Sequence, residues 1–276
     1  MSLSPVQEVA SVHAVTAEQL KVGGTTQPVL MRCAQAAENA LEAYVVKLYG
    51  NIPIGRRGLA REVFAAMLGQ AFGLDVPQIA IVDVAVDFWE TIPNHEIAHA
   101  VHLSPGANFG SHELGPGYLS PTFPVRISPD NTLQACEIFA FDMLIQNPDR
   151  NREKPNAFES GSGYSVFDHE KAFPYATPEM VLGLREPWEF SAFRGALEGH
   201  IFYKPLKRNP TIEFGPFFEN LAELDAKYLA QIENVMPDEW TSEQSVRLEL
   251  EHIREYLLVA AKNTPKFESA TRRALA

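Results

Sequence analysis

Cysteine is scarce in this sequence, since only Cys33 and Cys136 occur among its 276 residues. Two thiols cannot supply the disulfide framework of a small secreted fold, and so low a count is typical of a reducing compartment. We therefore expect both cysteines to be buried, reduced thiols. The N-terminus lacks the basic-then-apolar pattern of a signal peptide, and no stretch approaches the roughly 18 apolar residues of a membrane span. These absences predict a cytoplasmic protein with no membrane partner.

An excess of basic charge is also missing. The formal net charge is −12 and the isoelectric point is about 5.1. Binding to nucleic acid depends on clustered Lys and Arg that displace counterions from phosphates, so we expect no direct nucleic-acid partner. The length exceeds that of a usual single domain and favours one large, two-lobed domain over residues 1–276.

The first ninety residues combine strands and a helix. Short β-branched and aromatic runs at 26–33 and 42–50 predict strands, and another strand is expected over 76–86. Between them, residues 59–74 carry apolar side chains at helical spacing, which predicts an amphipathic helix of about four turns that ends at Gly73. This part of the chain, to about residue 92, is the expected small N-terminal lobe.

A shift in composition follows. Residues 93–129 are rich in Gly, Pro, Ser and His, as expected of an irregular segment at a lobe junction. Beyond it, residues 132–146 predict a helix, 164–173 predict a short strand and a turn, and the chain from 178 onward is mostly helical in pattern. Residues 93–276 are therefore the expected larger, mainly helical C-terminal lobe.

Lys47 and Glu62 are candidates for a nucleotide site. Lys47 lies between apolar neighbours in a predicted strand, where a charge is disfavoured unless it meets a ligand or a carboxylate. Glu62 opens the next helix and is a possible partner. The simpler alternative is that Lys47 is a solvated edge-strand residue and that Glu62 is a first-turn charge stabilised by the helix dipole.

The downstream pattern carries a stronger signal. A predicted helix runs into NPDRNREKPN at 147–156, and a second aspartate, Asp168, follows a hydrophobic strand. In a kinase, Asp149 would orient or accept the acceptor proton, Asn156 would supply an amide oxygen, and Asp168 would chelate the magnesium that bridges the phosphates of ATP. Arg150 is expected to brace the loop. The alternative for this segment is an ordinary turn, because Asn, Pro and Asp all favour turns.

At these residues the chain resembles the HipA-like kinases and, more distantly, the phosphatidylinositol kinases. The likeness covers nearly the whole chain, including YVVKLYGN, the helix and strand of 59–82, SPGANFGS, FDMLIQNPDR and FDHEKAF. It implies a two-lobed α+β kinase fold that uses ATP and magnesium to phosphorylate Ser or Thr of an unidentified protein. By the same likeness, Lys47 corresponds to the phosphate-binding lysine, Asp149 to the catalytic aspartate and Asp168 to the metal-binding aspartate.

Two departures from the family pattern affect the expected activity. Relatives commonly carry Asn five residues after the catalytic Asp, whereas this chain has Lys154 there and Asn at Asn156. The turn within residues 31–44 also contains no glycine, so a Gly-rich phosphate loop is absent. Both departures keep open a regulatory protein that binds nucleotide without transferring phosphate.

A competing motif is HEIAH at 95–99. On a helix, His95 and His99 would lie one turn apart and could bind zinc beside Glu96 as general base, with Glu137 as a third ligand in a metallopeptidase. The surrounding Pro and Gly residues limit this helix to about three turns. The plain alternative is a short surface helix with solvated histidines.

Overall fold

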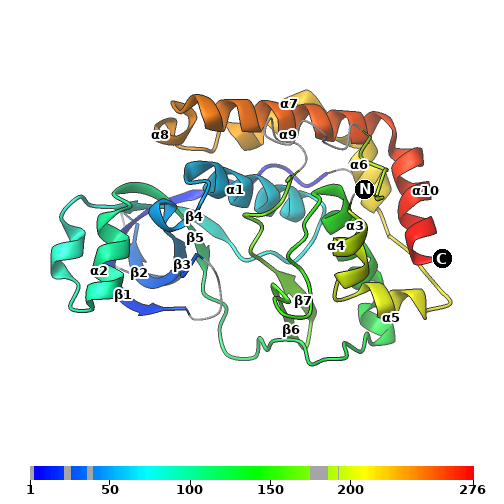
Figure 1. Ribbon diagram of the computed structural model, residues 1–276, viewed down its shortest axis with the longest axis horizontal. Coiled ribbons are helices and arrows are strands. Elements are labelled where there is room, and N and C mark those ends of the chain that lie inside the picture. The colour runs from blue at the N-terminus through cyan, green and yellow to red at the C-terminus, as the bar shows by residue number, and fades with distance from the viewer. Residues whose placement is uncertain (1–2, 22–25, 36–39, 175–185, 192) are drawn as a thin grey trace.

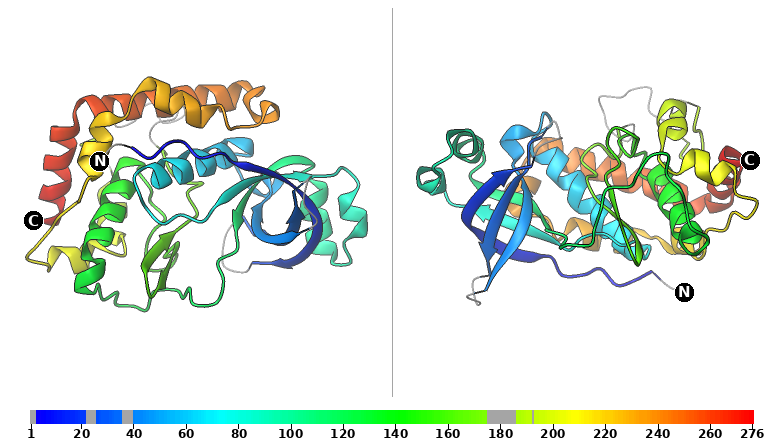
Figure 2. Two further views of the ribbon diagram at one scale, coloured as in Figure 1. Left: turned by 180° about the vertical axis from the view of Figure 1, so that it is seen from behind. Right: turned by 90° about the horizontal axis from the view of Figure 1, so that it is seen from below.

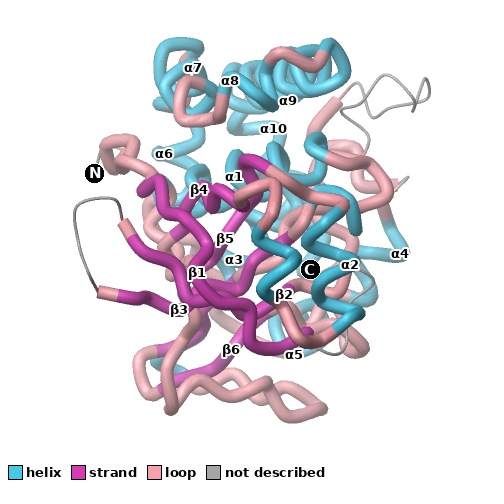
Figure 3. The backbone as a smooth tube through the Cα atoms, turned by 90° about the vertical axis from the view of Figure 1, so that its left-hand side faces the viewer, coloured by secondary structure: helices cyan, strands magenta, loops and turns pink. Residues whose placement is uncertain are grey.

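The computed structural model describes residues 3–21, 26–35, 40–174, 186–191 and 193–276. Its N-terminal part is β-rich and its C-terminal part is helical, which confirms the predicted α+β class (Figure 1). Five strands form a closed barrel in the order β1-β2-β3-β5-β4. They are β1 (Ala10–Leu20), β2 (Val29–Ala34), β3 (Leu41–Lys47), β4 (Ile79–Val84) and β5 (Gly106–His112). Figure 3 views this barrel from its outer end.

The barrel includes two strands that were not predicted. Strand β1 pairs antiparallel with β2 and parallel with β4. Strand β5 comes from the Gly- and Pro-rich segment and pairs antiparallel with β3 and β4. Its Gly110 lies so close to β4 that an added Cβ would sit 2.6 Å from Val82 Cγ2, which explains a glycine in a buried strand. The β-rich part therefore extends to His112.

Helix α1 (Arg56–Ala71) lies between the barrel and the helices of the C-terminal part (Figures 1 and 2). It was predicted as amphipathic, but 13 of its 16 residues are buried. Small residues permit this close packing, since a Cβ at Gly69 would lie 3.1 Å from Val76 Cγ2 and 3.3 Å from Phe141 Cζ. A helix that is covered on all sides holds its side chains in fixed positions.

The C-terminal part begins with α3 and a hairpin and continues as further helices. Helices α7 and α9 run across the top of α1 in Figure 1, and α10 lies at the end far from the barrel. The elements are α3 (Thr132–Leu144), β6 (Ala157–Ser160), β7 (Gly163–Val166), α4 (Arg194–Gly199), α5 (Tyr203–Lys207), α6 (Phe217–Glu223), α7 (Ala226–Glu233), α8 (Asp238–Thr241), α9 (Gln244–Lys262) and α10 (Thr264–Leu275). The short 3-10 helices are η1 (Tyr49–Asn51), η2 (Phe88–Thr91) and η3 (Pro129–Asn131).

Contacts from α8 and α9 join the two parts of the chain. Trp240 Nε1 donates to Ala107 O at 2.9 Å, and Ala107 N donates to Glu239 Oε2 at 3.1 Å, so α8 is bonded to β5. Glu249 on α9 forms a buried ion pair with Arg61 on α1. Since Arg61 precedes Glu62, this pair fixes the helix turn that carries a predicted site residue.

Both cysteines are buried and unpaired, as predicted. Over the stretch of chain that the structure describes, no helix combines the length and the apolar character needed to cross a bilayer.

Candidate functional site

A cavity of about 420 Å³ opens between the barrel, α1 and the loops of the C-terminal part. Apolar side chains from both parts form much of its wall, including Val45, Ile79 and Phe109 from the barrel side and Phe158 and Phe167 from the other. Charged side chains, among them those of Lys47 and Asp168, line the same cavity. An apolar wall with a few convergent charges is the usual character of a small-molecule site.

Lys47 is the last residue of β3 and is only 6% exposed. Its ammonium contacts Glu62 and Asp168 and lies 3.1 Å from Glu170 Oε2. Burial lowers the pKa of Lys47, but these carboxylates outweigh burial and hold the pKa above its ordinary value. Lys47 is therefore a buried, charged ammonium, and the alternative of a solvated edge-strand residue is wrong.

Glu62 connects α1 to the turn that carries Asp168. Its carboxylate accepts from His169 N at 2.8 Å and from Glu170 N at 2.9 Å, in addition to its contact with Lys47. Burial raises the pKa of Glu62 to about 7, although the Lys47 ammonium acts in the opposite direction. The alternative of a first-turn surface charge is therefore also wrong, because this side chain is buried and fully engaged.

Asp168 lies at a strained point of the backbone and faces the cavity. Its φ is +63°, in the left-handed region that few non-glycine residues adopt, and such strain clusters at functional sites. Its side chain is 26% exposed, whereas those of its neighbours in the cluster are nearly covered. Burial raises the pKa of Asp168, but the Lys47 ammonium outweighs it and keeps the group ionised.

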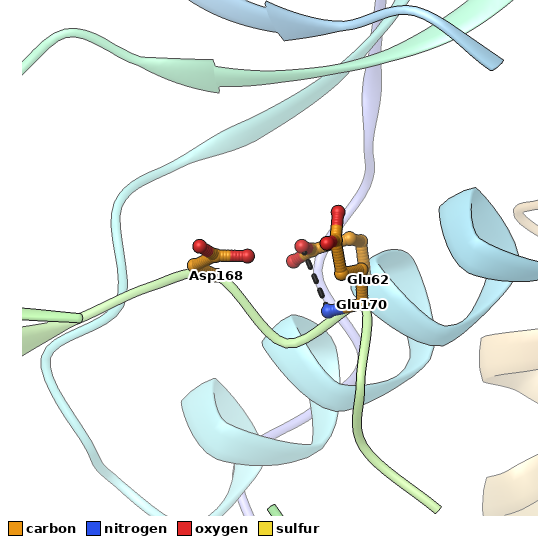
Figure 4. Close-up of side chains that lie close together, drawn as sticks. All are labelled: Glu62, Asp168 and Glu170. Carbon is orange, nitrogen blue, oxygen red and sulfur yellow. Dashed lines mark hydrogen bonds between the residues drawn. The ribbon is translucent and has the colours of Figure 1, made fainter. Parts of the chain in front are cut away.

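Glu62, Asp168 and Glu170 form a cluster of three carboxylates (Figure 4). One oxygen from each lies within 4.8 Å of the others, which is close enough to hold a metal ion. Lys47 is the ammonium in contact with them, and three carboxylates and one ammonium leave two negative charges in excess when all are ionised. A hard divalent cation such as Mg²⁺ binds carboxylate oxygens and would relieve this repulsion, so the residues present fit magnesium. Glu170 was missed in the sequence, although it stands two residues after Asp168.

Asp149 lies in the loop after α3, outside the cavity wall formed by Lys47 and Asp168. Its Oδ2 is 3.1 Å from Lys171 Nζ and 3.6 Å from Lys154 Nζ. Asn156 lines the cavity and donates from Nδ2 to Asp149 O at 3.2 Å. The structure therefore places Asn156 between the Asp149 loop and the cavity that contains the Lys47 cluster.

Arg150 is buried and braces this loop, as expected. It forms an ion pair with Asp142 on α3 and donates to Asn156 O. Its Nη2 lies 3.1 Å from His169 Nε2. Burial and the Arg150 charge lower the pKa of His169 to about 3, so the imidazole is neutral and accepts this hydrogen bond. Asp142 also contacts His200 Nε2 at 2.9 Å. One buried network thus joins the Asp149 loop, Asn156 and the Asp168 turn.

The HEIAH segment forms helix α2 (His95–His102), as the spacing predicted. Figure 1 shows α2 on the side of the barrel that faces away from the helical part. His95, Glu96 and His99 are exposed. In the described ranges, the side chains grouped closely enough for a metal are those of the Glu62 cluster, and neither these histidines nor Glu137 belongs to that group. The alternative zinc ligand set is not assembled, since Glu137 lies on α3 and is not grouped with the histidines of α2.

Comparison with family models identifies the chain. The model of the HipA-like kinases matches residues 17–270, so this chain belongs to the HipA-like kinase family and to the class of kinase-type phosphotransferases. The chain is also similar to a solved structure, the crystal structure of the Helicobacter pylori proinflammatory kinase CtkA. That match has a TM-score of 0.47 and 13% identity over 96% of this chain and 97% of that one. Comparison with curated proteins gave no match.

Proposed function

We propose that this protein is an ATP- and magnesium-dependent kinase that phosphorylates Ser or Thr of another protein. The observation that carries the proposal is the convergence of Lys47, Glu62 and Asp168 in one cavity. Lys47 lies 15 positions from Glu62 and 121 from Asp168 in sequence, yet its ammonium contacts both carboxylates. Membership of the HipA-like kinase family gives this arrangement its interpretation.

In this proposal, the barrel with α1 is the N-terminal lobe and the chain from α3 onward is the C-terminal lobe of a kinase fold. The cavity between them takes ATP. Apolar walls such as Val45 and Phe109 suit the adenine ring, and the charged end at Lys47 suits the phosphates. A small β-rich lobe and a larger helical lobe are what the sequence resemblance implies.

Each site residue then has a role in transfer. Lys47, held by Glu62, binds the phosphates of ATP, and Asp168 with Asn156 and Glu170 would hold magnesium. Bound there, magnesium would supply positive charge that stabilises the transferred phosphoryl group. Asp149 accepts the proton of the acceptor hydroxyl while that oxygen bonds to the γ-phosphorus and the bond to the β-phosphate oxygen breaks, which releases ADP.

The test is transfer of labelled phosphate from γ-labelled ATP to Ser- and Thr-containing proteins in the presence of magnesium. Asp149→Asn keeps the size of the side chain and removes its basicity, so we expect transfer to fall about 10²- to 10⁴-fold. Asp130→Asn changes an exposed aspartate of η3 and serves as the matched control. Equal transfer by wild type and Asp149→Asn would refute the assigned role.

A nucleotide-binding regulator without transfer activity remains the second candidate. Two observations favour it: the Lys47 ammonium is enclosed by three carboxylates, and Asp149 is flanked by two lysines. The two functions differ in outcome, since a regulator would bind ATP tightly and label no acceptor.

A further inference from the structure

Two lysines approach the carboxylate of Asp149, although one would neutralise it. Lys171 Nζ lies 3.1 Å and Lys154 Nζ 3.6 Å from Asp149 Oδ2. Two ammonium groups and one carboxylate leave one positive charge in excess at this point. The Lys47 cluster has the opposite excess, with three carboxylates to one ammonium.

The backbone holds Lys154 in a defined position. Asn151 N donates to Lys154 O at 2.9 Å, and Lys154 N donates to Asn151 Oδ1 at 3.1 Å, which closes a tight loop. The Lys154 side chain lines the same cavity as Lys47 and Asp168 and is 26% exposed. Lys154 therefore borders the space in which the nucleotide is proposed to bind.

Lys171 approaches from a different element. It follows Glu170 directly, so its backbone is part of the turn that Glu62 ties to α1. Its side chain is 40% exposed and reaches back to Asp149. A lysine on each of two separate loops thus faces the proposed general base, and Lys154 also lines the cavity.

We propose that Lys154 and Lys171 bind the terminal phosphate of ATP beside Asp149. An ammonium carries three donors, and one contact to Asp149 leaves others for phosphate oxygens. The inference rests on the proposed function and adds to it the residues that recognise the phosphoryl group being transferred. Lys154, which stands where relatives commonly carry asparagine, then contributes charge at the reacting phosphate.

We predict that Lys154 and Lys171 distinguish ATP from ADP, because ADP lacks the phosphate that they bind. We would measure binding of the imido analogue of ATP and of ADP, each with magnesium, to the full chain by calorimetry. Lys154→Met and Lys171→Met should each weaken the analogue about tenfold, as expected for one lost charge-assisted hydrogen bond, and leave ADP binding nearly unchanged. Lys171→Arg should retain most of the preference for the analogue.

Lys262→Met removes an exposed lysine near the end of α9 and is the matched control, with no expected change for either nucleotide. Retained ADP binding also shows that each variant is folded. Equal weakening of the analogue and ADP, or no weakening of either, would overturn the role of the lysine pair. Absence of any nucleotide binding by wild type would instead overturn the proposed function, and the lysine pair with it.

Discussion

The buried ion pair between α9 and α1 gives the most specific prediction about stability. Glu249 is fully buried, its Oε1 contacts Arg61 Nε, and its Oε2 lies 3.5 Å from Arg57 Nη1. Arg61 is itself only 7% exposed. Removal of Glu249 leaves the buried Arg61 charge without this carboxylate, and breaking a buried pair in this way typically costs about 3–5 kcal/mol. We therefore expect Glu249→Leu to lower the free energy of unfolding by about this amount.

The assay is urea denaturation of wild type, Glu249→Leu, Arg61→Met and the double variant. Each single variant should be destabilised, and Glu249→Leu the more strongly, because it leaves the buried Arg61 without this carboxylate, whereas in Arg61→Met the Glu249 carboxylate keeps Arg57 Nη1 at 3.5 Å. The double variant replaces the pair by apolar side chains of similar size and should lie within about 1–2 kcal/mol of wild type, far less than the sum of the single effects. Simple additivity of the two single effects would refute the reasoning, because it would mean that the two side chains do not interact.

Three other predictions follow from the same structure. Lys47→Met should weaken binding of ATP at least tenfold in calorimetry, because it removes the ammonium at the charged end of the cavity, and unchanged affinity would exclude that role. Gly69→Ala should destabilise by about 1–3 kcal/mol in urea, since its Cβ would meet Val76 Cγ2 at 3.1 Å, while Gly195→Ala, whose Cβ meets nothing, should not destabilise. Burial holds the pKa of His200 below its ordinary value, so its contribution to stability is complete above about pH 6.5 and is lost as the pH falls. The fall in thermal midpoint between pH 7.5 and pH 5.5 should therefore be smaller in His200→Gln than in wild type.

The sequence was most informative where a local pattern coincides with a structural element. Helix α1, the strands containing residues 29–34 and 41–47, and the turn at Asp168 all follow from periodicity and composition. Strand β5 was missed because its residues Gly106, Asn108 and Gly110 disfavour strands locally. Packing explains them instead, since the buried Asn108 amide donates to Ser104 O at 2.8 Å and to Gly106 O at 3.0 Å.

The candidate site was likewise predictable from the sequence only in part. Lys47, Glu62 and Asp168 could be proposed from motifs, but their mutual contacts depend on a barrel that no local pattern defines. Glu170 and Lys171 were not singled out because a charged residue in a turn is usually solvated. Their significance lies in which distant side chains they reach. The predicted loop within residues 31–44 includes residues 36–39, which lie outside the described part of the chain.

The central claim is that the cavity at Lys47 and Asp168 binds ATP with magnesium. Calorimetry of ATP binding with and without magnesium, on wild type, Asp168→Ala and the exposed-site control Asp87→Ala, tests it most directly. We predict magnesium-dependent binding that is lost in Asp168→Ala and kept in Asp87→Ala, with no zinc in the purified protein. Binding that is unaffected by Asp168→Ala, or stoichiometric zinc that disappears in His95→Ala without any ATP binding, would contradict the account.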